Sequence, residues 1–126
     1  MSYSFSWENN GVYWKYEGIL DISKLIHANA ELIGNKQIED ISYIIWDASA
    51  INAENLDDEE AIEISATFSK AVDALNSHIK VAFIALDEHL RALINQYLEQ
   101  NLKQIPHAKL KLFDKLDNAR NWIASE

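Results

Sequence analysis

Hydrophobic and polar residues alternate one by one at the start of the chain. Two such runs, over residues 3–7 and 12–17, flank the residues Asn9-Asn10-Gly11. Period two is typical of a strand with one buried face, and asparagine and glycine tolerate the backbone angles of tight hairpin turns. The pattern therefore predicts an opening antiparallel β-hairpin.

Beyond the hairpin, helical spacing alternates with short strand-like runs. Helices are predicted from Asp21 to Gly34, over Asp57–Ser77, over Leu90–Leu102 and after Asp114, the third ending before Pro106 because proline lacks a backbone N–H. Strands are predicted at Tyr43–Trp46, Val81–Leu86 and Lys109–Leu112, the last at a sheet edge. We expect one α/β domain over residues 1–126, of order β-β-α-β-α-β-α-β-α, whose mostly parallel sheet has an antiparallel hairpin strand and flanking helices.

The composition narrows the classes of function. The 126 residues include 48% hydrophobic side chains, no cysteine, and 20 acidic against 11 basic residues, so that the net charge is −9. Binding to nucleic acid or to anionic lipid needs a cationic face, which this balance disfavours. The longest apolar run, Val81–Leu86, is far shorter than the ~20 residues of a membrane span, and no signal peptide is visible. We expect a cytoplasmic protein.

Aspartate stands at four predicted junctions between a strand and a helix, at Asp21, Asp47, Asp87 and Asp114. Aspartate commonly caps helices, because its side chain accepts a hydrogen bond from an unpaired N–H of the first turn. Asp47 is the exception, since at least seven residues separate it from the next helix. Without a nucleophile motif, a phosphate-binding glycine loop or a histidine pair, we predict no catalytic residue, metal or cofactor; an enzyme hypothesis rests on Asp47 and His89 alone.

Aromatic residues are concentrated in the hairpin. Six of the chain's thirteen fall there and point to both faces of the strands: Tyr3, Phe5, Trp7, Tyr13, Trp14 and Tyr16. Helices packed on both faces of the sheet would bury them. The functional alternatives are an apolar groove for a ligand and a surface for self-association, which would make the protein a homodimer.

Three segments carry a resemblance to a known family. They are Tyr43–Ser49, which ends in Asp-x-Ser, Leu110–Asp114, and the Ala-x-x-Trp-Ile segment Ala119–Ile123. Together with the element order, they resemble the SpoIIAA-like or STAS-type proteins, which are related in fold to anti-sigma-factor antagonists and to CRAL-TRIO lipid-transfer domains. The resemblance implies a fold and a partner-facing region. It does not carry over a phosphorylation switch, because residues 53–60 lack the serine turn of the classical antagonists and contain no hydroxyl.

Acidic residues are concentrated near that same region. Nine carboxylates and no base lie between Lys36 and Lys70. Acids that open a helix are stabilised by its dipole, which is the structural explanation; the functional one is a surface that attracts a basic partner. The candidate surface comprises Asp47, Ser49, Asn52, Asn55, Asp57, Asp58, Glu59, Glu60, Asp87 and His89. We expect a non-catalytic regulatory or protein-binding module, with a carrier or sensor of a small apolar or lipid-like ligand as the alternative.

Overall fold

Five strands form one mixed sheet in the computed structural model, which describes residues 1–75, 78–101 and 108–125. The strands lie in chain order across the sheet; β1 is antiparallel to β2, and the other neighbours are parallel. The elements are β1 Ser2–Trp7, β2 Gly11–Ile19, α1 Ile22–Ile33, the 3-10 helix η1 Lys36–Asp40, β3 Tyr43–Asn52, α2 Asp58–Asp73, β4 Ile79–Ala85, α3 Glu88–Asn101, β5 Ala108–Phe113 and α4 Leu116–Ala124. The predicted fold class and element order are confirmed; η1 was not predicted.

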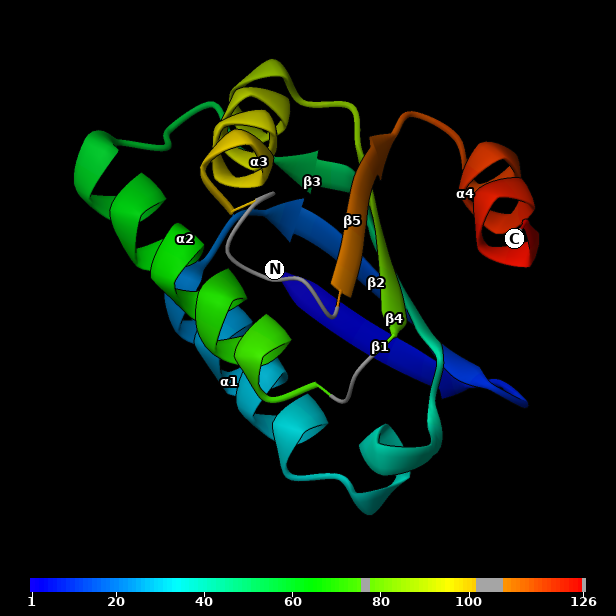
Figure 1. Ribbon diagram of the computed structural model, residues 1–126. Helices are drawn as coiled ribbons and strands as arrows, with labels where there is room; N and C mark the ends of the chain where they lie inside the picture. Colours follow the sequence, from blue (N-terminus) through cyan, green and yellow to red (C-terminus); the bar gives the residue numbers. More distant parts are fainter. Residues whose placement is uncertain (76–77, 102–107, 126) are drawn as a thin grey trace.

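The helices divide between the two faces of the sheet. Helices α1, α2 and α3 cover one face and α4 covers part of the other (Figure 1). Right-handed crossovers that advance in one direction across a parallel sheet place their helices on the same side. The larger core fills the space beneath α1–α3, and a smaller core around Ile45, Ala82, Ile84 and Ala119 lies beneath α4. Central strands β3 and β4 are therefore buried on both faces, which explains their apolar runs.

Aromatic rings connect the hairpin to the larger core. The Trp14 and Tyr16 rings are stacked 5.5 Å apart, and Tyr16 meets Trp46 of β3 edge to face at 5.3 Å. The Trp46 ring continues the chain to Phe68 of α2, with 4.3 Å between centroids. Offset and edge-to-face pairs of this kind add to the stabilisation from burial. Much of the aromatic surplus in the hairpin is therefore core.

Aspartate side chains cap three of the helices, and two of these aspartates, Asp21 and Asp87, are among the four predicted at junctions. Asp21 accepts from the Lys24 N–H at 3.3 Å, and Asp57 caps α2 by accepting from the Glu60 N–H at 2.8 Å. Asp87 accepts from the first turn of α3. The prediction that Asp114 caps the last helix is wrong, because that helix begins one residue later, with Lys115 at the cap position and no side-chain bond to the first turn.

Strand β3 is six residues longer than predicted, and Asp47 lies in its interior. The prediction that Asp47 marks a junction between strand and helix is therefore wrong. The strand contains a β-bulge after Asp47. Lys15 of β2 pairs with Asp47, whereas Glu17 pairs with Ala50, so β3 has one more residue than β2 over this stretch. The Asp47 carboxylate holds this bulge by accepting from both the Ser49 N–H, at 3.0 Å, and the Ser49 hydroxyl, at 2.6 Å.

Other predicted boundaries differ by a few residues. Helix α2 ends at Asp73, where the Ala74 N–H donates back to the Lys70 carbonyl, and β4 ends at Ala85. The predicted end points Ser77, Leu102 and Pro106 lie outside the described residues. None of the helices in the described ranges is long and apolar enough to cross a membrane.

Candidate functional site

The carboxyl ends of the parallel strands form an uneven edge. Strands β2 and β3 run on together to the pair Ile19 and Asn52, whereas β4 pairs with β3 only as far as Ala85. Beyond Asn52, the chain turns through Ala53–Leu56 and enters α2. Figure 1 shows this loop between β3 and the amino-terminal end of α2. In open α/β sheets this edge is where ligands and partners usually bind, because the connecting loops gather there.

Asp87 connects two of the loops at this edge. One carboxylate oxygen accepts from the Ala53 N–H at 2.7 Å, and the other accepts from the N–H groups of His89, at 2.9 Å, and Leu90, at 3.3 Å. Partial burial raises the pKa of Asp87, but these three backbone bonds outweigh it, so the pKa lies below its ordinary value. Asp87 thus fixes the loop before α2 against the start of α3.

The start of α2 presents its acids to solvent. Asp57, Asp58 and Glu59 are exposed, and Glu60 is half-buried. Within the described part of the chain, no base forms an ion pair with any carboxylate from Glu54 to Glu63. The amino-terminal end of the helix dipole stabilises these charges, so they can stay together without partners.

Exposed apolar side chains accompany the acids. Ile19 at the end of β2 is 64% exposed, Leu86 after β4 is 55% exposed, and Ile62 in the second turn of α2 is 71% exposed. Sequence reasoning missed all three. It assigned Leu86 to a buried strand, because the residue ends the run that begins at Val81 and nothing local shows that β4 stops one residue earlier.

Asp47 and Ser49 do not belong to this edge surface. Asp47 is only 5% exposed and shares the α4 side of the sheet with Ile45, two residues earlier on β3. The Tyr13 hydroxyl donates to its second carboxylate oxygen, and the half-buried Ser49 donates to the first. Both residues therefore hold the bulge, and their polar groups are already used inside the protein.

A polar network that sequence reasoning missed lies next to Asp47. The Arg120 guanidinium of α4 lies over the Tyr13 ring, 5.7 Å from its centroid, and donates two bonds, of 3.0 and 2.7 Å, to the Glu8 carboxylate. Tyr43 also donates to Glu8, and the Arg120 bonds hold the pKa of Glu8 below its usual range. The two partners are 112 residues apart, and no local pattern reveals such a pair.

The two residues of the enzyme hypothesis, His89 and Asp47, do not lie together in the structure. His89 is exposed in the first turn of α3, and its Nδ1 atom lies 3.5 Å from an Asp87 oxygen. Asp47 faces the opposite side of the sheet. The two residues cannot work as a pair from these positions. Across the described residues, no three side chains among histidine, aspartate and glutamate gather as metal ligands.

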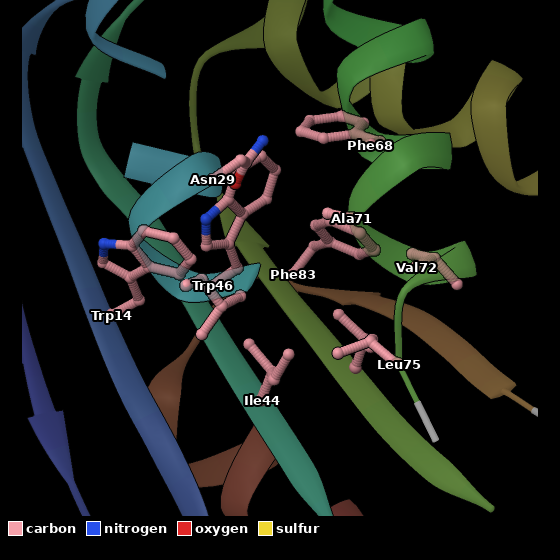
Figure 2. Close-up of a pocket in the computed structure, with 11 residues that line it drawn as sticks. Trp14, Asn29, Ile44, Trp46, Phe68, Ala71, Val72, Leu75 and Phe83 are labelled. Atoms are coloured by element: carbon pink, nitrogen blue, oxygen red, sulfur yellow. The ribbon is translucent and has the colours of Figure 1, made fainter. Parts of the chain in front are cut away.

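Apolar cavities lie beneath α1 and α2. Figure 2 shows the first, about 30 Å³, between Trp14, Trp46 and Phe83 of the sheet and the helix residues Asn29 and Phe68. A second, of about 20 Å³, lies beside it. Each has room for about one water molecule, whereas the pockets that bind drug-sized ligands measure roughly 300–1,000 Å³. The carrier hypothesis stays a prediction, which native mass spectrometry of freshly purified protein tests through the presence or absence of a bound lipid mass.

The hairpin aromatics fall into three groups. Trp14 and Tyr16 are buried in the larger core, and Tyr13 faces α4. Three others, all half-buried, follow one side of β1: Tyr3, Phe5 and Trp7. Five of the six therefore lie on the face of the larger core, where Tyr3, Phe5 and Trp7 form a partly exposed row along the outermost strand, and Tyr13 alone lies on the α4 face.

Comparison with known proteins addresses the fold. No protein-family profile and no curated protein matches the sequence. Among solved structures, the chain is similar to an anti-sigma factor antagonist from Mycobacterium paratuberculosis, with a TM-score of 0.67 and 15% sequence identity. The match covers 98% of this chain and 94% of that protein. The predicted resemblance is confirmed: the chain has the STAS-type fold of an anti-sigma factor antagonist.

Proposed function

We propose that the protein is a non-catalytic regulatory module that binds a protein partner through an acidic edge. We define the acidic edge as the exposed residues Ile19, Asn52, Glu54, Asn55, Asp57, Asp58, Glu59, Ile62 and Leu86. The observation that carries the proposal is the combination of unpaired carboxylates at the start of α2 with three exposed, large apolar side chains. The solved antagonist with the same fold supports a regulatory role for such a module.

The chemistry of the acidic edge suits a basic protein surface. Apolar side chains supply the area that becomes buried in an interface, and a charged rim steers a partner of opposite sign and fixes its orientation. Asp87 holds the supporting loops through backbone bonds, so the surface is formed before the partner arrives. Preorganisation reduces the entropy lost on binding. Residues 53–60 contain no hydroxyl, so we propose binding without phosphorylation of this turn, in the cytoplasm.

A charge-reversal variant tests this proposal. Glu54→Lys, Asp58→Lys and Glu59→Lys together reverse the acids while leaving the Asp57 cap and the half-buried Glu60 in place. Binding partners are captured from the native organism's extract on immobilised wild-type protein, identified, purified and titrated. We expect the triple variant to bind the purified partner at least tenfold more weakly, with a smaller dependence of affinity on salt concentration.

The matched control changes the net charge equally at other places. Asp40→Lys, Glu99→Lys and Asp117→Lys reverse three exposed acids on η1, α3 and α4. This variant should keep the wild-type affinity if the acidic edge is the interface. Equal loss of affinity in both variants would show that only the overall charge matters, and unchanged affinity in the first would overturn the proposal.

A further inference from the structure

Strand β1 lies at one edge of the sheet, and among the described strands only β2 pairs with it, so one set of its backbone hydrogen-bonding groups faces away from the sheet. In an antiparallel pair, successive residues direct their N–H and C=O groups alternately toward the neighbouring strand and away from it. The Glu8 N–H donates to the Gly11 carbonyl at 2.8 Å, so the even-numbered residues of β1 face β2. The backbone groups of Tyr3, Phe5 and Trp7 therefore point outward, along the open edge.

The two edges of the sheet differ in the features that prevent strand pairing. Natural edge strands commonly carry lysine, proline or a bulge, which discourages a second chain from pairing with them. Strand β5 follows this rule, because Lys109 and Lys111 are exposed on it. Strand β1 has the sequence Ser-Tyr-Ser-Phe-Ser-Trp, with no charge, proline or glycine, and it pairs with β2 without a register shift. In a chain of net charge −9, this edge is unusual in being neutral and open.

The side chains of β1 are also suited to pair with a copy of themselves. Tyr3, Phe5 and Trp7 lie on the side of the larger core and keep part of their surface exposed, while Ser2, Ser4 and Ser6 on the other side are exposed and small. Aromatic pairs across neighbouring strands stabilise a sheet, and serine presents no steric obstacle. The strand thus offers a matching edge of backbone groups and a row of aromatics that a second strand would cover.

We infer that β1 pairs antiparallel with β1 of a second copy across a twofold axis, which joins the two sheets into one of ten strands. Because the outward groups belong to odd-numbered residues, odd-numbered residues must face one another. The register that pairs all three of them places Phe5 opposite Phe5 of the second copy, Tyr3 opposite Trp7, and Ser4 opposite Ser6. A twofold interface is closed, since both open edges are used up. The lysines of β5 prevent further growth at the outer edges. This inference does not depend on the proposed function, because β1 is not part of the acidic edge.

Sedimentation velocity with charged variants of β1 tests the inference. Wild-type protein should sediment as a species of twice 14.4 kDa. In the double variant Ser4→Glu with Ser6→Glu, each glutamate meets a glutamate across the interface, so dimer affinity should fall at least tenfold. Within the monomer, residue 4 pairs with Lys15 of β2, which suits a glutamate and keeps the fold. The control, Asn95→Glu with Asn118→Glu on α3 and α4, changes the charge equally and should remain a dimer.

Mixing variants of opposite charge gives the decisive result. Ser4→Lys with Ser6→Lys should also be monomeric alone, and an equal mixture with the glutamate variant should restore a dimer that contains one copy of each. Amide hydrogen exchange supplies a second readout: the N–H groups of Tyr3, Phe5 and Trp7 should be protected in the wild type and exchange rapidly in either variant. A monomeric wild type, a dimer that tolerates both variants, or a mixture that stays monomeric would overturn the inference.

Discussion

Gly11 lies where β2 starts, directly beneath the ring of Tyr43. A Cβ atom at this position would overlap that ring, so the observed position of the Tyr43 ring requires glycine here. The same tyrosine donates to Glu8, which also receives the Arg120 guanidinium. The absent side chain of Gly11 therefore sets the position of a ring that belongs to the network joining the hairpin to α4.

Replacing Gly11 should destabilise the fold, and a second substitution at Tyr43 can test whether the clash with its ring is the cause. We expect Gly11→Ala to lower the free energy of unfolding by about 1–3 kcal/mol, because the added methyl group displaces the Tyr43 ring. Urea denaturation measures the change. In a Tyr43→Ala background the same substitution should cost much less, since the obstacle is gone; equal costs in the two backgrounds would show that the clash is not the cause.

Asp47 shows what single residues reveal before a structure is known. The sequence marks it as unusual, because it is a carboxylate that no nearby helix explains. The location inferred from this was wrong, since a polar residue after Trp46 looks like the end of a strand. The strand continues because Tyr13 and Ser49 satisfy the buried carboxylate. Tyr13 is 34 residues away, so the compensation that keeps Asp47 in the sheet could not be predicted locally.

At the scale of elements, α4 shows how a short helix is held by contacts from elsewhere. Its apolar residues Ala119, Trp122 and Ile123 pack against the sheet in the smaller core, as their spacing predicts. Its carboxyl end is held by Lys80 of β4, whose ammonium donates to the carbonyl groups of Trp122 at 3.0 Å and Ser125 at 2.5 Å. A cation at this end of a helix satisfies unpaired carbonyl groups and the helix dipole together.

Removing the Lys80 charge should loosen α4 in particular. We expect Lys80→Met to cost about 1 kcal/mol or less overall, and to accelerate amide hydrogen exchange over Leu116–Ala124 while β3 and β4 exchange as before. Lys109→Met, at an exposed lysine of β5, is the matched control and should leave α4 unchanged. Uniformly faster exchange in all elements would mean that the lysine stabilises the sheet rather than the helix.

Elements with strong periodicity were predictable, and their ends were not. The face of α2 that contains Ile64, Phe68 and Val72 is buried as its spacing indicates. The 3-10 helix η1 escaped prediction because it has five residues and a single buried side chain, Ile38, which is too little for a period. Strand β4 ends before Leu86, where its pairing with β3 also ends at Ala48 and Ala85, and a partner strand is not part of the local pattern.

For the whole molecule, two carboxylates connect distant segments and make stability depend on pH. Asp87 joins the loop before α2 to α3, and Glu8 joins the hairpin to α4; both have a pKa below the ordinary value. A lowered pKa in the folded state means that the unfolded state binds protons more readily in acid. The stabilisation is therefore fully present above the ordinary carboxyl pKa of about 4 and is lost as the pH falls toward the lowered values.

The Asp87→Asn variant tests this dependence. At neutral pH we expect it to be less stable than the wild type by about 1.5–3 kcal/mol, because an amide offers one acceptor oxygen in place of two charged ones. The difference should stay steady from about pH 7 to about pH 5 and should narrow from about pH 4 down to about pH 2, as the wild-type carboxylate becomes protonated. Urea denaturation across this range measures it, and a difference that stays constant would contradict the role of the charge.

The distribution of charge over the whole molecule was readable from the sequence, but the composition of the surface was not. Exposed acids at the start of α2 stand where the base-free stretch of sequence placed them. The exposed apolar residues Ile19, Ile62 and Leu86 come from three separate parts of the chain, at the end of β2, in α2 and after β4. Their exposure depends on where the strands end and how α2 packs, so a local sequence motif reveals the charge and not these residues.

The bond between Glu8 and Arg120 also has a consequence for the order of events during synthesis. The ribosome makes Glu8 112 residues before its partner, so the hairpin leaves the exit tunnel with this carboxylate unmatched and the smaller core uncovered. Interactions of such long sequence separation form late, after the nearer strands have paired. Docking of α4 is accordingly a closing step, and a nascent chain paused before residue 116 would present the surface around Ile45 and Ala82 to chaperones.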